Sequence, residues 1–144
     1  MGKIKTKENN KRGPQAKLGV VNYPLGDFLI RLKNAGLARH KVVLSRRTKI
    51  IEAMAEALKR EGFLESIRKE NDRLEVSLSF RKKEPVILGM KLVSKPGLRV
   101  YLGVEDLEKR RKPSILLLTT PKGVVSAKDA ILARVGGEVI VEVW

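Results

Sequence analysis

The C-terminal stretch of residues 114–144, SILLLTTPKGVVSAKDAILARVGGEVIVEVW, decides the fold that we expect for this chain. Its apolar run at residues 115–118 predicts a buried strand, because a short apolar run bounded by turn signals is typical of a core strand. Ser126 is a typical N-cap for a short helix, and Gly136-Gly137 is expected to end that helix. Residues 138–144 predict a last strand. The stretch therefore indicates a sheet with one short helix and a rigidly held loop.

The loop expected between this strand and the helix carries groups that bind anionic oxygens. Thr119 and Thr120 supply hydroxyls. Lys122 supplies a positive charge, and Gly123 allows a backbone to approach closely. A phosphate-binding enzyme is one interpretation, but the loop lacks the P-loop pattern and Pro121 removes one backbone donor. An RNA-contacting edge is the favoured interpretation, and we do not expect an enzyme.

The charge balance favours a polyanionic partner. The 31 Lys and Arg residues oppose 16 Asp and Glu residues, which gives a net charge of +15. Nucleic acid is the first candidate and an anionic membrane the second. Aromatic residues make up 4 % of the chain, and no apolar run approaches the roughly 20 residues of a membrane span. We therefore expect an RNA-binding protein with no membrane partner.

The residue types needed for most cofactor and nucleophile chemistry are missing. The chain has no cysteine, which excludes disulfides, thiolate metal sites and a Cys nucleophile. A single histidine, His40, leaves no basis for most histidine metal sites or catalytic triads. We expect no cofactor, no metal and no small-molecule substrate. The N-terminus lacks the apolar core of a secretory signal, which predicts a cytoplasmic protein, with an organelle as the alternative.

Two amphipathic helices are expected in the first half of the chain. The first begins at Pro24, places Phe28 and Leu32 on one apolar face, and ends at Gly36. Ser45 is expected to cap the second helix. Its first turn would hold three cations, Arg46, Arg47 and Lys49. A cation at that position interacts unfavourably with the helix dipole, at a free-energy cost of a few tenths of a kcal/mol. The three cations therefore either serve an anionic partner or are merely tolerated.

Strands complete the two units that we expect. Residues 63–69 and 73–80 predict two strands around a turn, so residues 22–84 read as an α-β-α-β-β unit. Residues 81–85 would be a linker, and residues 86–93 would begin the second unit as a strand. The fold class is therefore α+β: an N-terminal α/β domain, 22–84, packed on a mostly β domain, 85–144. The basic extension, 1–21, is either disordered or an arm that orders on RNA.

A second candidate RNA contact lies near residue 100. Ser94-Lys95-Pro96-Gly97 has the type II turn signature, with Pro at i+1 and Gly at i+2. Arg99 and Tyr101 follow on the return strand. Tyr101 either stacks on a base or packs against a neighbouring side chain. The densest cation run, KRRK at residues 109–112, comes shortly afterwards.

Several short motifs, in order and spacing, resemble the family of the eighth protein of the small ribosomal subunit, in its bacterial form. The resemblance covers residues 24–144. The motifs are DFLIRLKN at 27–34, EGF at 61–63, the turn SKPG at 94–97 leading through Arg99 to Tyr101, KGV at 122–124, and GGEV at 136–139 with EVW at 142–144.

The resemblance implies two packed α/β domains that bind the central domain of small-subunit rRNA directly and support subunit assembly and translation. It also implies contacts with neighbouring small-subunit ribosomal proteins. The family's main contact motif, Ser-Thr-Ser-x-Gly, corresponds to residues 119–123, TTPKG. Pro121 departs from it, and the loss of one neutral hydrogen bond would typically cost about 0.5–1.5 kcal/mol. A regulatory role, repression of an mRNA that mimics the rRNA site, is the alternative.

The sequence analysis therefore ends with one set of expected RNA-binding residues. They carry hydroxyls, positive charges, an aromatic ring or a glycine, and they are Thr119, Thr120, Lys122, Gly123, Ser94, Lys95, Arg99, Tyr101, Arg31, Lys33, Arg46, Arg47 and Lys49.

Overall fold

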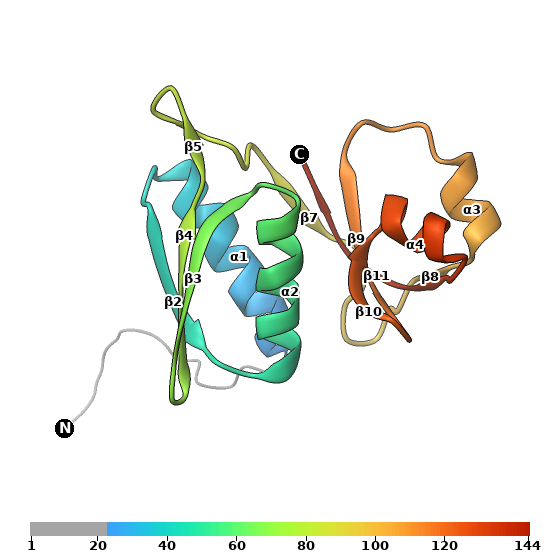
Figure 1. Cartoon of the computed structure of the whole chain (residues 1–144), viewed down its shortest axis with the longest axis horizontal. Helices are drawn as coiled ribbons and strands as arrows, with labels where there is room; N and C mark the ends of the chain where they lie inside the picture. Colours follow the sequence, from blue (N-terminus) through green and yellow to red (C-terminus); the bar gives the residue numbers. More distant parts are fainter. Residues whose placement is uncertain (1–22) are drawn as a thin grey trace.

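The computed structural model describes residues 23–144, and the predicted basic extension, 1–21, lies outside the described residues. The chain forms a three-stranded sheet covered by two helices and a five-stranded sheet that carries two short helices, and Figure 1 shows the two parts side by side. The three-stranded sheet lies within residues 42–78 and the five-stranded sheet within residues 90–143. This arrangement confirms the α+β class. Within residues 23–144, no helix has the length and apolar character to cross a membrane.

Helix α1, Pro24–Leu37, has the apolar stripe that the sequence predicts. Pro24 lies in its first turn, and Phe28 and Leu32 are fully buried. The helix continues through Gly36, so the prediction that this glycine ends it is wrong. Gly36 is buried in the helix instead, and a Cβ there would lie 3.3 Å from the carbonyl oxygen of Ile87. The glycine therefore allows α1 to pack closely against the backbone at Ile87, in the segment that leads into the five-stranded sheet.

Helix α2, Lys49–Arg60, begins later than predicted because Thr48, and not Ser45, is its N-cap. The Thr48 side chain accepts a hydrogen bond from the N–H of Ile51 at 3.2 Å. Strand β2, Val42–Arg46, takes up both Ser45 and Arg46. Of the three predicted first-turn cations, Lys49 alone lies in the helix. Only one cation, and not three, therefore interacts unfavourably with the dipole of this helix.

Strands β3, Leu64–Glu70, and β4, Arg73–Leu78, form the predicted antiparallel pair, and the sheet order is β2-β4-β3. Side chains alternate along β4, and Leu74, Val76 and Leu78 are fully buried. The predicted linker at residues 81–85 is a hairpin instead. Strands β5, Phe80–Arg81, and β6, Glu84–Pro85, pair across two lysines that both have positive φ, as a type I′ hairpin turn requires.

The five-stranded sheet contains short and long strands from the second half of the chain. Its order is β10-β9-β11-β7, and β8 also pairs with β11. The strands are β7, Met90–Leu92, β8, Tyr101–Leu102, β9, Ile115–Thr120, β10, Gly123–Ser126, and β11, Gly137–Val143; the helices are α3, Val104–Lys109, and α4, Ala127–Ala133. The predicted strand at 86–93 is thus reduced to three residues. Residues 119–123, predicted as a loop between strand and helix, form the end of a β-hairpin.

The glycine pair after α4 has a different role from the one predicted. The helix ends at Ala133, and the C-cap residue Arg134 adopts the left-handed conformation with φ 57°. A Cβ on Gly137 would lie 2.2 Å from the carbonyl oxygen of Thr119, and one on Gly136 would lie 2.5 Å from that of Leu102. Both glycines therefore allow the strands to approach one another, and Ser126 caps α4 as predicted by accepting a hydrogen bond from the N–H of Asp129.

Strand β9 contributes to two hydrophobic cores because successive side chains of a strand point to opposite faces. Leu117 belongs to the larger core, which also contains residues of α1, α2 and the three-stranded sheet. Leu116 and Leu118 belong to a smaller core beneath α3 and α4. The Arg60 guanidinium at the end of α2 also donates to the carbonyl of Val124 at 2.8 Å. The two halves of the chain therefore share one core.

This shared core predicts that both halves unfold together. Leu117→Ala should lower the free energy of unfolding by about 2–5 kcal/mol, because it leaves a cavity in the larger core. Urea unfolding can be followed by fluorescence of Trp144, the single tryptophan, and by far-UV circular dichroism of the helices. Both signals should shift together. A shift of the Trp144 transition alone would show that the halves unfold separately.

Candidate nucleic-acid interface

The β9–β10 hairpin holds the first group of predicted RNA-binding residues. Thr120 is 8 % exposed, and its hydroxyl donates to the carbonyl of Gly123 at 2.8 Å. The same oxygen accepts from the N–H of Lys122 at 3.1 Å. Gly123 has φ 108°, a conformation that favours glycine. The Thr120 hydroxyl therefore closes the turn, while the exposed Lys122 side chain is free to meet a ligand.

The turn at residues 94–98 holds the second group, and its predicted geometry is confirmed. Gly97 has φ 87°, and the N–H of Leu98 donates to the carbonyl of Lys95 at 2.9 Å. Ser94 is fully buried, and its hydroxyl accepts from the N–H of Val100 at 2.9 Å. The Tyr23 hydroxyl donates to the Ser94 carbonyl at 3.3 Å. Ser94 thus fixes the turn, and Lys95 is exposed on it.

Strand register brings residues from three separate segments to one end of the five-stranded sheet. Glu138 of β11 lies opposite Tyr101 of β8 on one side and opposite Thr119 of β9 on the other. Arg99 joins this row through an ion pair with Glu138 at 3.1 Å. Tyr101 is 68 % exposed, so its ring is open to a ligand. We call Arg99, Tyr101, Thr119, Lys122 and Gly123 the sheet-end surface.

The electrostatics around Arg99 hold its guanidinium in place. The hydrogen bond to Glu138 raises the pKa of Arg99, so its positive charge persists. Its guanidinium carbon also lies 5.9 Å from the centre of the Tyr23 ring, a cation–π distance. Burial raises the pKa of Tyr23, and the nearby Glu138 carboxylate adds to that rise. The sequence analysis did not single out Glu138, because its position between Arg99 and Tyr101 depends on strand register.

The predicted cations of the first half do not form one site. Arg31 and Arg46 line a concave site of ≈ 310 Å³ together with Arg73, which the sequence analysis missed. Arg73 lies opposite Arg46 in the β2–β4 register, a pairing that no local sequence pattern reveals. Arg31 also pairs with Asp27 at 3.1 Å.

The remaining predicted cations lie elsewhere. Arg47 pairs with Glu52 at 2.9 Å and donates to the carbonyl of Glu70, so its charge is already matched within the protein. Lys33 lines a groove between α1 and β7, which Lys95 also lines, and Lys49 is exposed at the start of α2.

The cation run at residues 109–112 is not uniformly solvated. Arg110 lies against β11, where its guanidinium donates to the Ser114 carbonyl at 2.8 Å and pairs with Glu142 at 3.3 Å. The Ser114 hydroxyl also donates to the Glu142 carboxylate. That hydrogen bond, assisted by the charges of Lys112 and Arg110, lowers the pKa of Glu142. One arginine of the run thus anchors the segment, while Arg111 and Lys112 are exposed.

The described residues hold no group of three or more His, Cys, Asp or Glu side chains that could bind a metal ion. What the geometry offers is a basic surface with exposed hydroxyl and aromatic groups.

Comparison with known proteins shows to which family the chain with this surface belongs. The profile of the family described as ribosomal protein S8 matches residues 23–144.

The chain belongs to the ribosomal protein S8 family. A relative from Nitratidesulfovibrio vulgaris strain Miyazaki F, named small ribosomal subunit protein uS8, is 43 % identical over 122 residues, which cover 84 % of this chain and 97 % of the relative. Proteins of the same name from Chloroflexus aggregans and Clostridium acetobutylicum are 41 % and 40 % identical over 131 residues, covering 86 % and 87 % of this chain and 98 % and 99 % of theirs. The S8 match spans every described residue and confirms the predicted family.

The hydrogen bonds of Thr120 predict a cost for removing its hydroxyl. Thr120→Val keeps the branched shape but removes both bonds that close the hairpin, so the free energy of unfolding should fall by about 1–2 kcal/mol. Thr119→Val is the matched control on the same strand and should change stability by less than about 0.5 kcal/mol. Urea unfolding of both variants measures the difference. Equal effects would mean that the Thr120 hydroxyl does not hold the turn.

The Glu142 network predicts a pH-dependent contribution to stability. Because the folded-state pKa of Glu142 lies below its ordinary value of 4.5, its stabilisation is present above that value and is lost as pH falls through the folded pKa. Glu142→Gln should therefore cost about 1 kcal/mol at pH 7 and nothing at low pH. Unfolding at several pH values tests this, with the exposed Glu108→Gln as control. A difference that persists unchanged at low pH would contradict the assignment.

Proposed function

We propose that this S8 family protein binds the central domain of small-subunit rRNA directly, with residues 85–144 as its main RNA-binding domain and residues 22–84 as a second domain. Membership of the family makes it a structural, rRNA-binding component of the small ribosomal subunit that serves translation, and not an enzyme. Its place is therefore in the ribosome. We further propose a cytoplasmic ribosome and early, direct RNA binding during subunit assembly.

The observation that carries this proposal is the strand register at the sheet end. It brings an exposed aromatic ring, Tyr101, and a partly exposed hydroxyl, Thr119, to the same end of the sheet as the hairpin turn with Lys122. An exposed ring can stack on an unpaired base, and hydroxyls can bond to phosphate or ribose oxygens. Such contacts read the shape of a folded RNA.

The buried hydroxyls have a different role in this proposal. Thr120 and Ser94 are bonded within the protein, so they act as positioning residues that hold the hairpin and the turn in shape. Arg99 stays tied to Glu138 and presents its remaining N–H groups. Gly123 provides a backbone without a side chain at the turn. The departure from the family motif at Pro121 removes one contact but leaves this framework intact.

The first domain would add phosphate contacts. Arg31, Arg46 and Arg73 line one concave site together with Asp72, and guanidinium groups suit phosphate oxygens. Lys49 is exposed and would add less specific attraction, whereas Lys33 lines the groove between α1 and β7. Arg47 and Arg31 would contribute less than the other cations, because Glu52 and Asp27 already pair with them. These contacts would strengthen binding without adding sequence specificity.

A salt series with a central-domain rRNA fragment tests the proposal. The protein should bind this fragment more tightly than an unrelated hairpin, and the preference should survive moderate salt. Lys122→Ala should lower the salt slope by about 1, because one phosphate contact is lost. Thr120→Ala should weaken binding at every salt concentration and leave the slope unchanged, because it loosens the turn. Lys59→Ala, an exposed lysine on α2, is the control. Equal, steeply salt-dependent binding to both RNAs would sink the proposal.

A further inference from the structure

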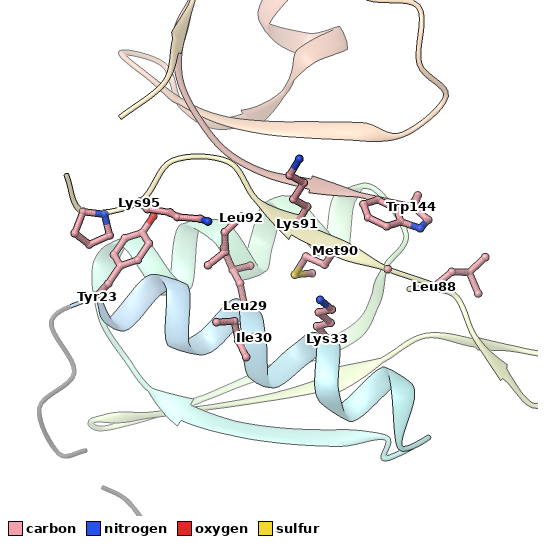
Figure 2. Close-up of a pocket in the computed structure, with 12 residues that line it drawn as sticks. Tyr23, Leu29, Ile30, Lys33, Leu88, Met90, Lys91, Leu92, Lys95 and Trp144 are labelled. Carbon is pink, nitrogen blue, oxygen red and sulfur yellow. The ribbon is translucent and has the colours of Figure 1, made fainter. Parts of the chain in front are cut away.

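We propose that the groove between α1 and β7 docks an acidic, apolar segment of a neighbouring protein in the small subunit. This α1–β7 groove has a volume of ≈ 800 Å³. Figure 2 shows Tyr23 and Lys95 near one end, Leu88 and Trp144 at the other, and Met90 between them. The groove adjoins the sheet-end surface proposed to meet RNA, because Tyr23 lines the groove and its ring centre lies 5.9 Å from the guanidinium carbon of Arg99.

The apolar lining of the groove is unusually open. Ile30 is 46 % exposed, Leu88 is 68 % exposed and Trp144 is 48 % exposed. Each of these side chains is large, and all three line one groove. Contiguous exposed apolar surface of this kind is typical of a binding surface, because burying it on a partner is favourable.

The aromatic part of the lining is already fixed in position. The N–H groups of Leu88 and Gly89 both donate to the Trp144 carbonyl, at 2.8 and 3.0 Å, and the Trp144 N–H donates back to Gly89 at 3.1 Å. A Cβ on Gly89 would lie 2.4 Å from the Trp144 ring, so the indole packs directly on this backbone. Little ordering of the ring would therefore be needed on binding, and a preformed site binds more tightly than one that must first be ordered.

The charges of the groove decide which partner fits. Lys33, Lys91 and Lys95 are exposed around the apolar lining, and the lining residues include no Asp or Glu. Among the described residues, none of these three lysines forms an ion pair. A segment that places apolar side chains in the groove and carboxylates beside the lysines would match both features.

The two competing occupants match less well. The chain's own residues 1–21 join the structure beside Tyr23, but they contain six cations and one acid, so the lysines would repel them. RNA would match the lysines, and a base could stack on the exposed Trp144 ring, but the aliphatic side chains of Ile30 and Leu88 would find no apolar partner in a ribose–phosphate backbone. An acidic, apolar protein segment satisfies the charge and the apolar surface together.

Photo-crosslinking in the assembled subunit tests this inference. Full-length protein carrying p-benzoylphenylalanine in place of Leu88 is reconstituted into small subunits, irradiated and analysed by mass spectrometry. The expected product joins position 88 to a segment of another ribosomal protein that contains apolar and acidic residues. The matched control carries the same photoreactive group in place of Leu132, an exposed leucine on α4 away from the groove, and should not give that product.

A charge variant distinguishes a partner segment that binds the groove through complementary charges from one that only lies close to it. Adding Lys91→Glu to the photoreactive protein should lower the crosslink yield about five-fold or more, because it places a like charge beside the carboxylates of the partner. A crosslink to rRNA, to residues 1–21 of the same chain or to a segment without acids would overturn the proposal. So would the absence of any crosslink, or a yield that Lys91→Glu leaves unchanged.

An RNA-binding measurement distinguishes failure of the docking proposal from failure of the proposed rRNA binding. Leu88→Ser should leave the affinity for the central-domain rRNA fragment within about two-fold, since Leu88 is not part of the surface proposed to meet RNA. The same variant should lose docking of the partner segment, seen in reconstituted subunits as the loss of protection of the Trp144 indole from hydroxyl-radical oxidation, which mass spectrometry assigns to this chain. A large loss of RNA affinity in Leu88→Ser would show that RNA occupies the groove.

Discussion

The structure depends on the alternation of side chains along strand β9. Leu117 faces the core shared with the two long helices, and Leu118 faces the core beneath α3 and α4. Because one strand closes both cores, its position fixes the five-stranded sheet against the rest of the molecule. The pairing with β11 adds a further constraint, since only a residue without a side chain fits at Gly137, against the Thr119 carbonyl. The end of β9 is therefore held rigidly by buried contacts.

That rigidity explains why polar groups near the sheet end serve two different purposes. A hydroxyl that is buried must be bonded inside the protein, and Thr120 and Ser94 satisfy this requirement by fixing turns. Thr119 and Tyr101 lie on the same sheet but remain accessible, so they can contact a ligand without disturbing the fold. Thr119 and Thr120 are adjacent in sequence, but the strand places them on opposite faces. Thr120 therefore holds the turn in position, while Thr119 can contact a ligand.

Sequence patterns predicted the features that depend on neighbouring residues. The buried stripe of α1, the β3–β4 strand pair, the turn with Gly97 and the cap at Ser126 are all local. The features that were missed depend on distant pairing. Gly123 to Ser126 form a strand because β9 is available to pair with them, and Arg73 and Glu138 gain their importance from strand register. Ser45 was a sound N-cap candidate, but pairing with β4 extended β2 through it and moved the cap to Thr48.

The same sheet also determines where an RNA and a protein segment could bind at the same time. Strand β11 pairs with β8 near Glu138 and with β7 near Val143, so its two ends support different surfaces. One end carries exposed hydroxyl, aromatic and cationic groups, and the other carries Trp144 and the apolar groove. Each surface rests on backbone pairing of a single buried strand. An RNA and a protein segment could therefore bind at the same time, and they would meet at Lys95, which lies on the turn and also lines the groove.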